Sequence, residues 1–179
     1  MKTYISILRG INVSGHNLIK MGALKILLTE LGFINVRTYI QSGNVVFEST
    51  LPDEEKIALV ISGGIHDRFG FVVPVIVFSH DYLESLMAKN RFLYERVEDI
   101  LKLHITFLSR EPAIGLSDAI SSDQYLPDEF YIEGNAVFLF CPNGYGNTKL
   151  SNTFFEKKLK VQATTRNWKT ILELARMTE

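Results

Sequence analysis

The chain has 179 residues, of which 46% are hydrophobic and 22% are charged, which fits a soluble globular protein with a real core rather than a disordered chain. The net charge of −1 at pH 7 argues against a dedicated DNA-binding surface, although residues 1–50 and 147–179 are basic and residues 51–146 are acidic. No apolar stretch approaches the roughly 20 residues of a membrane span, and the N-terminal apolar run is too short for a signal peptide, so we expect a cytoplasmic protein without a membrane partner.

In chain order, the first 79 residues alternate between strand and helix signals. β-Forming residues predict strands, and apolar residues three and four apart predict helices. The expected elements are a strand at 3–8, a helix at 20–33, strands at 36–40 and 44–49, a helix at 52–70 and a strand at 71–78. The turn QSGN predicts a hairpin because Gly43 and Asn44 tolerate positive φ, and Pro74 places the last strand at a sheet edge.

The remaining residues carry a similar series of signals. We expect a linking helix from Ser79 to about Asn90, a strand at 103–108, a short helix at 111–120, strands at 129–132 and 135–140, a helix at 148–159, a strand at 161–165 and a last helix at 166–177. In the 52–70 helix the apolar positions expected on one face are Ile57, Val60, Ile61, Ile65 and Phe69. In the last helix they are Trp168, Ile171, Leu172 and Ala175.

An internal repeat connects the two halves. The segment YIQSGNVVF from Tyr39 aligns with YIEGNAVF from Tyr131, with one residue deleted at the turn. We therefore predict an α+β fold of two tandem ferredoxin-like βαββαβ repeats with a linking helix and a C-terminal helix. The first repeat is expected at 1–79, and residues 80–179 hold the linking helix, the second repeat and the last helix; one continuous α+β domain is the alternative.

The stretch LRGINVSGHN after the first strand has more hydrogen-bonding groups than a connector needs. In a βαββαβ unit this loop and the hairpin turn lie at the same end of the sheet. Backbone N–H groups beside a helix N-terminus favour anions, and an arginine can bind an anion through two hydrogen bonds. The predicted ligand-binding residues at this end are Arg9, Gly10, Asn12, Gly15, His16, Asn17, Gln41, Ser42 and Asn44.

A second polar cluster is predicted at the other end of the second repeat. The segments NTKLSN and ATTRNW are both helix starts and lie at that end by the same topological argument. The candidate residues are Lys149, Ser151, Asn152, Arg166 and Asn167. Helix capping alone accounts for Thr148 and Thr165, but it does not account for Lys149 and Arg166, whose charges oppose the helix dipole.

The sequence contains no signature of a metal site, a cofactor site or a catalytic triad. His16, His66, His80 and His104 have neither metal-ligand spacing nor a cysteine cluster, so we predict no metal. The single Cys141 cannot form an internal disulfide. No phosphate-loop or dinucleotide motif occurs, so no cofactor is predicted and no catalytic residue is assigned.

Four segments of the chain together resemble one protein family. LRGINVSGHN, RTYIQSGNVVF, TKLSNTFFEKKL and ATTRNW are similar to a bacterial family known as domain-of-unknown-function family 1697. The chain departs from the family pattern at Ser14, where glycine is common, and at Leu18, where a polar residue is common. The resemblance implies a compact cytoplasmic α+β protein and supplies no activity, substrate or cofactor.

Three functions remain open from the residues. The first is a binding module for an anionic or nucleotide-like small ligand at the first loop and the hairpin turn. The second is an enzyme that processes phosphate or acyl phosphate, with His16 as its acid or base. The third, less favoured, is RNA binding on the sheet face, for which Tyr4 and Phe47 would supply the stacking aromatics. A purely structural loop is the alternative to all three.

Overall fold

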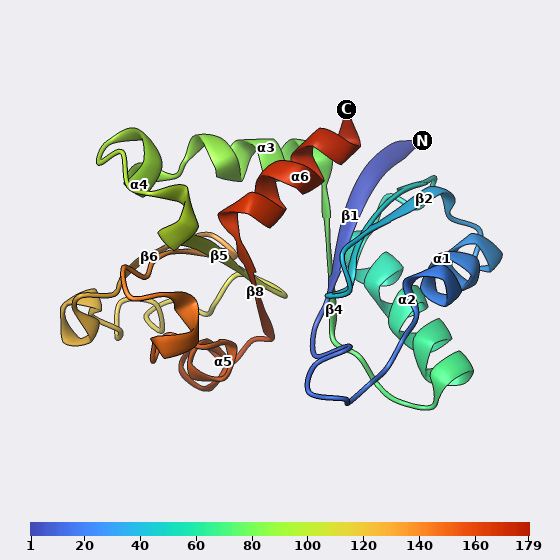
Figure 1. Ribbon diagram of the computed structural model, residues 1–179, viewed down its shortest axis with the longest axis horizontal. Helices are drawn as coiled ribbons and strands as arrows, with labels where there is room; N and C mark the ends of the chain where they lie inside the picture. The colour runs from blue at the N-terminus through green and yellow to red at the C-terminus, as the bar shows by residue number, and fades with distance from the viewer. The chain divides into compact units, whose positions relative to one another are not determined.

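The computed structural model describes residues 1–179 and contains α-helices together with two four-stranded antiparallel sheets (Figure 1). The chain divides into two compact units. Unit 1 comprises residues 1–85 and 174–179, and unit 2 comprises residues 86–173. Each unit has a hydrophobic core on the helix-covered side of its own sheet. No helix is long and apolar enough to cross a bilayer.

Unit 1 is built on a sheet with the strand order β2-β3-β1-β4. Its elements are β1 (Lys2–Leu8), α1 (Met21–Glu30), β2 (Ile34–Tyr39), β3 (Asn44–Ser49), α2 (Glu54–Phe69), β4 (Val75–Ser79) and the first part of α3 (His80–Ala88). Both α1 and α2 cover the same face of the sheet (Figure 1). As the position of Pro74 predicts, β4 is an edge strand.

Helix α2 shows how the local sequence sets an element. The side chain of Asp53 accepts a hydrogen bond from Lys56 N at 3.1 Å and caps the helix start, and Gly70 ends the helix at φ +81°. Ile57, Ile61 and Ile65 are fully buried, as their spacing predicts, whereas the prediction for Val60 is wrong. Val60 lies one position outside the buried stripe and is 37% exposed.

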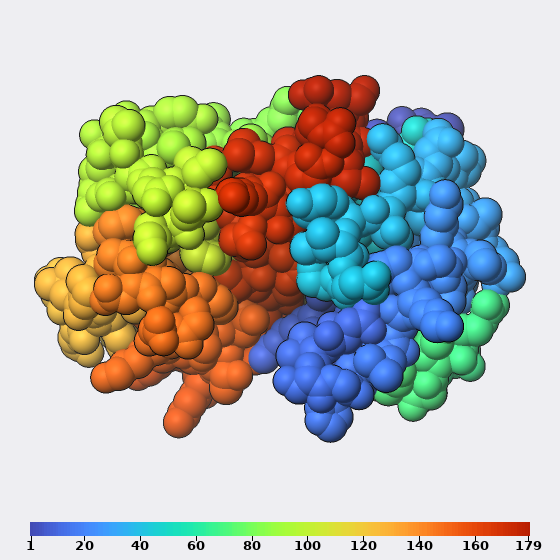
Figure 2. Space-filling view, in the orientation of Figure 1, coloured from blue at the N-terminus to red at the C-terminus, as the bar shows by residue number.

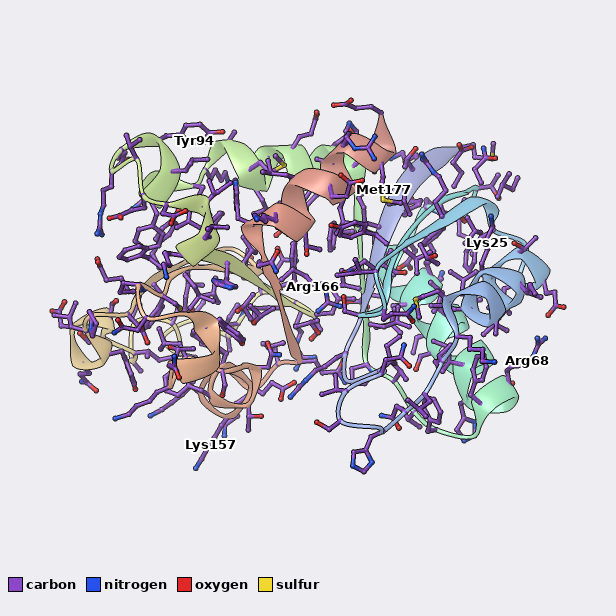
Figure 3. All side chains as sticks on the ribbon, viewed as in Figure 1. Lys25, Arg68, Tyr94, Lys157, Arg166 and Met177 are labelled. Atoms are coloured by element: carbon purple, nitrogen blue, oxygen red, sulfur yellow. The ribbon has the colours of Figure 1, made fainter.

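The two helices of unit 1 are also joined at their exposed ends. Arg68 of α2, labelled in Figure 3, forms an ion pair with Glu30 of α1. The pair is open to solvent, so it adds little stability, and the apolar contacts between the helices hold them together.

Unit 2 has a sheet with the order β6-β7-β5-β8, which is the order of unit 1. Its elements are the end of α3, α4 (Arg91–Tyr94), β5 (Leu103–Leu108), β6 (Glu129–Glu133), β7 (Ala136–Phe140), α5 (Asn152–Leu159), β8 (Ala163–Asn167) and the first half of α6 (Trp168–Thr178), with 3-10 turns at Ile100–Lys102, Ser122–Tyr125 and Tyr145–Asn147. Helix α5 covers one face of the sheet through Phe155 and Leu159. On the opposite face Phe92 of α4 contacts Tyr131 and Phe140.

The helix expected at 111–120 is absent, so that prediction is wrong. Pro112 and Gly115 interrupt the segment, Gly115 has φ +88°, and Ile114 is fully exposed. The helix pattern there had too few apolar residues to bury a face against the sheet, so turns are favoured instead. The α+β class is observed, but unit 2 has no α-helix between its first two strands.

Three further details differ from the predictions. Helices α5 and α6 begin at Asn152 and Trp168, several residues after Thr148 and two after Arg166, because Ser151 and Asn167 are the capping residues. Leu172 of α6 is 40% exposed, and Leu174 takes the buried position instead.

In the hairpin turn Gly43 has φ +76° as expected, but Asn44 begins β3 and the second positive φ is at Ile40 (φ +49°).

Candidate functional site

Three connections meet at one end of the unit 1 sheet. The opening loop (9–20) follows β1, the hairpin turn (40–43) joins β2 to β3, and residues 70–74 precede β4. Leu8 N donates to Gly43 O at 2.8 Å, and Arg9 N donates to Pro74 O at 3.0 Å. The loop and the hairpin turn are therefore direct neighbours, and the blue segment after β1 lies at the surface in Figure 2.

The amide of Asn12 holds the opening loop against the hairpin turn. Its Nδ2 donates to Ile19 O at 2.9 Å and to Gln41 O at 2.8 Å, and its Oδ1 accepts from Ile19 N at 2.9 Å. These three bonds close the loop at both ends and leave one oxygen lone pair unused. Asn12 is thus a structural residue of the site rather than a group that faces a ligand.

Two more asparagines have similar roles. Asn17 Nδ2 donates to Gly10 O at 3.1 Å, and Asn44 Nδ2 donates to Tyr39 O at 3.2 Å and to Ser42 Oγ at 2.9 Å. Asn44 is fully buried. Of the residues predicted for this end, three amides and the Ser42 hydroxyl therefore have partners inside the protein.

The backbone of the opening loop is unusual because five of its residues have positive φ. They are Gly10 (+72°), Asn12 (+55°), Ser14 (+49°), Gly15 (+78°) and Asn17 (+47°). His16 N donates to Val13 O at 2.9 Å and closes a tight turn at the loop tip. The N–H groups of Gly10, Ser14 and Gly15 have no acceptor within the chain. Alternation of φ sign with unused N–H groups is typical of backbone concavities that bind anions.

The charges at this end of unit 1 have one sign. Arg9 and Lys20 are the charged residues of 9–20, 40–43 and 70–74, and these segments contain no aspartate or glutamate. His16 and Gln41 are exposed, and Arg9 is half-buried. Lys20 is not among the ligand-binding residues predicted from the sequence, because the helix pattern includes it. The absence of aspartate and glutamate between residues 9 and 20 is a sequence signal that could have identified it.

Exposed apolar side chains surround this polar backbone. Val13 is 57% exposed, Leu18 is 66%, Ile40 is 51% and Val72 is 70%, and they belong to the same three connections. Ile40 has positive φ, a conformation that a β-branched residue rarely adopts without a compensating reason. Large exposed apolar groups gathered around a polar centre suit a ligand that is partly apolar.

In unit 2, the residues of the second predicted cluster divide between several roles. Ser151 Oγ accepts from Phe154 N at 3.2 Å, and Asn167 Oδ1 accepts from Thr170 N at 2.8 Å, so both are helix caps. The capping roles expected for Thr148 and Thr165 therefore belong to other residues. Lys149 is exposed.

A partly buried hydrogen-bond network occupies the helix-covered side of the unit 2 sheet. Thr165 Oγ1 donates to Asn152 Oδ1 at 2.7 Å, accepts from Tyr145 Oη at 3.0 Å and lies 2.7 Å from Thr106 Oγ1. His104, which is 8% exposed, stacks on the Tyr145 ring, and its Nδ1 has no hydrogen-bond partner. Burial lowers the pKa of His104, and the nearby Lys102 carbonyl raises it by less.

Arg166 lies on the other face of β8, because adjacent residues of a strand point to opposite faces. Its Nη1 donates to Thr165 O at 2.9 Å, and burial lowers its pKa to about 10, so the guanidinium is charged at neutral pH. Figure 3 labels Arg166 beside β8. The sheet thus separates it from Asn152 and Asn167, and the predicted second cluster is not one surface.

Cys141 follows β7 and is fully buried. Burial raises the pKa of its thiol to about 11, and Asp128 adds to this rise. No three histidine, cysteine or carboxylate side chains come together in a way that could hold a metal ion.

Residues 1–138 match a protein family described as Protein of unknown function (DUF1697). The chain belongs to this family. The match ends before the TKLSNTFFEKKL segment, so the unit 2 network lies mostly outside it. No curated protein matches this DUF1697 sequence.

A solved structure resembles this DUF1697 protein over nearly its whole length. It is described as that of the conserved bacterial protein SP0830 from Streptococcus pneumoniae. The TM-score is 0.76, the sequence identity is 22%, and the match covers 99% of each chain. At that identity the likeness concerns the fold, and it extends beyond residue 138 to both units of the chain.

Proposed function

We propose that the end of unit 1 formed by the opening loop and the hairpin turn binds an anionic small ligand. The observation that carries the proposal is a hydrogen-bonded loop with unused backbone N–H groups, two cationic residues and no carboxylate on any of the three connections. An anion placed there gains hydrogen bonds and charge attraction from connections that carry no aspartate or glutamate.

The roles of the polar residues within this proposal follow from their partners. Asn12, Asn17 and Asn44 hold the loop in shape, since their amides bond to backbone groups. The ligand would contact Arg9, Lys20, Gln41 and the N–H groups of Ser14 and Gly15. A loop fixed before binding loses less entropy on binding than a mobile one, which supports a binding role.

The exposed apolar residues favour a ligand with an apolar portion beside its anionic group. Leu18 and Ile40 flank the Asn12 to Gln41 connection, and each is more than half exposed. A nucleotide or an aromatic phosphate has both parts, whereas inorganic phosphate has one. We therefore propose nucleotide-like anions as the ligand class.

The other two hypotheses have less support. Tyr4 and Phe47 are each 1% exposed and belong to the core beneath the helices of unit 1, so they are inaccessible to RNA bases. For an enzyme, His16 is exposed at the tip of the turn, and no second acid or base contacts its side chain. Ligand binding without chemistry is the proposal that these residues support best.

Binding is tested by thermal unfolding in the presence of inorganic phosphate, AMP, ATP or uncharged adenosine, at constant ionic strength. Stabilisation should grow as RT ln(1 + [L]/Kd) for the anions, be larger for the nucleotides than for phosphate, and be absent for adenosine at about 1 mM. Equal shifts with sodium chloride alone would contradict specific binding.

The matched variants are Lys20→Gln and Lys25→Gln, which remove the same charge from exposed positions before and within α1. Lys20→Gln should weaken AMP binding by about fivefold, in line with the loss of one charge-assisted contact. Lys25→Gln should bind AMP as the parent protein does. If both variants bind equally well, the proposed site is wrong.

A further inference from the structure

Unit 2 has an open pocket of about 220 Å³ where α3 ends and α4 begins. Its walls include Lys89, Asn90, Arg91, Tyr94, Glu95 and Glu133. Tyr94, labelled in Figure 3, is the last residue of α4 and is 62% exposed. The pocket is smaller than the roughly 300–1,000 Å³ of typical drug-sized sites, so it suits a ligand the size of one amino acid.

Asn90 is the unexplained residue of this pocket. Its side chain is 1% exposed, yet its Oδ1 has no hydrogen-bond partner. It occupies the N-cap position of α4 with φ −74° and ψ 95°, where an asparagine oxygen ordinarily accepts a backbone N–H, but this cap bond is not formed. Buried polar atoms nearly always have partners, so an unpartnered one beside a pocket indicates an absent donor.

The neighbouring backbone is fixed, which prevents Asn90 from relaxing. Tyr131 Oη donates to Lys89 O at 2.9 Å and accepts from Arg91 N at 2.8 Å, so one side chain of β6 holds the residues on both sides of Asn90. The Tyr131 ring stacks on Phe138 with a centroid distance of 4.8 Å. The backbone on both sides of Asn90 is therefore held in place by the sheet.

The pocket also has two charges of opposite sign without ion-pair partners. Lys89 Nζ pairs with Glu133 Oε1 at 3.0 Å, but Arg91 and Glu95 form no ion pair. The Arg91 guanidinium lies over the Tyr131 ring, 5.0 Å from its centroid, and this contact orients it without neutralising it. An available cation, an available anion and an amide oxygen together match a small zwitterion.

We propose that this pocket binds a free α-amino acid. Arg91 would bind the carboxylate, Glu95 would bind the ammonium group, and the ammonium or a neighbouring N–H would donate to Asn90 Oδ1. The ligand side chain would then leave the pocket along Tyr94. This site is in unit 2 and does not depend on the anion site proposed for unit 1.

Binding is tested on the full chain by NMR titration with L-leucine, L-lysine and L-glutamate. Each amino acid is compared with its carboxamide and its N-acetyl form, which lack one of the two charges. At least one free amino acid should bind with a millimolar Kd, and both blocked forms should bind about tenfold more weakly. If no amino acid shifts any resonance at about 20 mM, or if the blocked forms bind as well, the proposal is wrong.

Variants separate the site from a nonspecific charge effect. Glu95→Gln changes an exposed side chain with no internal partner, so it should fold normally and lose binding by about tenfold. Asn90→Ala should also lose binding, and because truncation of this buried side chain leaves a small cavity, its fold is checked by the dispersion of its NMR spectrum. Lys157→Gln, on the exposed face of α5, is the control and should bind as the parent does. Unchanged binding by Glu95→Gln would overturn the assignment.

Discussion

Asn12 shows how a residue that looks like a ligand contact can be part of the scaffold. Its side chain bonds to two backbone carbonyls and one backbone N–H, and one of these groups belongs to the neighbouring hairpin turn. Positive φ at this position further favours asparagine, which tolerates the left-handed region better than most residues. The residue type therefore serves both the conformation and the hydrogen bonds of the loop.

This role predicts the stability of two glycine variants. Asn12→Gly keeps the positive φ accessible but removes three hydrogen bonds, so the free energy of unfolding should fall by about 2 kcal/mol. Asn17→Gly, at φ +47° with one side-chain hydrogen bond, should lose less than about 1 kcal/mol. Urea denaturation followed by circular dichroism measures both. If the two variants lose equal free energies of unfolding, the extra side-chain hydrogen bonds of Asn12 contribute no measurable stability.

For individual residues, the sequence predicted which side chains lie at the same end of the unit 1 sheet, but not which groups those side chains contact. The topology argument correctly brought the opening loop beside the hairpin turn. It could not show that the amides would bond inward, because Gln41 O is 29 residues from Asn12 and its orientation depends on the folded turn. Asn90 was missed entirely, since a missing hydrogen bond has no sequence signal.

At the scale of elements, the β2–β3 hairpin depends on close packing at its turn. Gly43 has φ +76°, and a Cβ placed there would lie 2.7 Å from Leu8 Cβ and 2.8 Å from Ile11 Cδ1. The turn therefore needs glycine for two reasons, conformation and space. Ile40, three residues earlier, also has positive φ. The sequence does not predict this conformation, because isoleucine favours strands.

Two alanine variants separate these reasons. Gly43→Ala should lower the free energy of unfolding by about 3 kcal/mol, because it combines an unfavourable φ with steric overlap. Gly15→Ala has nearly the same φ (+78°) but open space around the new methyl group, so it should lose about 1 kcal/mol. Chemical denaturation of both variants provides the comparison, and a Gly15→Ala loss as large as that of Gly43→Ala would exclude the steric contribution.

Elements with strong periodicity were predicted well, and weak ones were not. Ile57, Ile61 and Ile65 bury a regular stripe, and α2 forms as expected. The 111–120 segment had no such stripe, and proline and glycine within it favour turns. Helix starts moved by a few residues because capping depends on which side chain reaches the first free N–H groups, as Ser151 does.

At the scale of the whole molecule, the free energy of unfolding should depend on pH through His104. Its pKa in the folded protein lies below the ordinary 6.5, so the unfolded chain binds the proton more readily. This contribution to stability is present above pH 6.5 and is lost as pH falls from there toward the folded-state pKa. The slope can reach about 1.4 kcal/mol per pH unit.

The measurement is urea unfolding at several pH values between about 7.5 and 5.5, followed by the fluorescence of the single, buried Trp168. His104→Phe keeps a ring against Tyr145 and removes the titrating group, so stability should change less with pH than in the parent. His16→Gln removes an exposed histidine as the control. A parent and a His104→Phe variant with the same pH dependence would contradict the assignment to His104.

The shared strand order of the two units agrees with the internal sequence repeat noticed at Tyr39 and Tyr131. The repeat was detectable because the hairpins keep similar residues. The sequence could not show that unit 2 would lack a helix after its first strand, since that depends on how much apolar surface the segment buries. Comparison of the two units also shows that only unit 1 has the polar LRGINVSGHN loop after its first strand.

Transient opening of the folded unit 2 can be measured by labelling Cys141 with a thiol reagent. Cys141 is the single cysteine of the chain, it is fully buried, and burial raises its pKa to about 11. In the closed protein almost none of the thiol is ionised at neutral pH, and thiol reagents act on the thiolate. The rate at which a reagent labels this sulfur therefore reports how often unit 2 opens and exposes its core to solvent. The natural cysteine serves as the probe, so none has to be introduced.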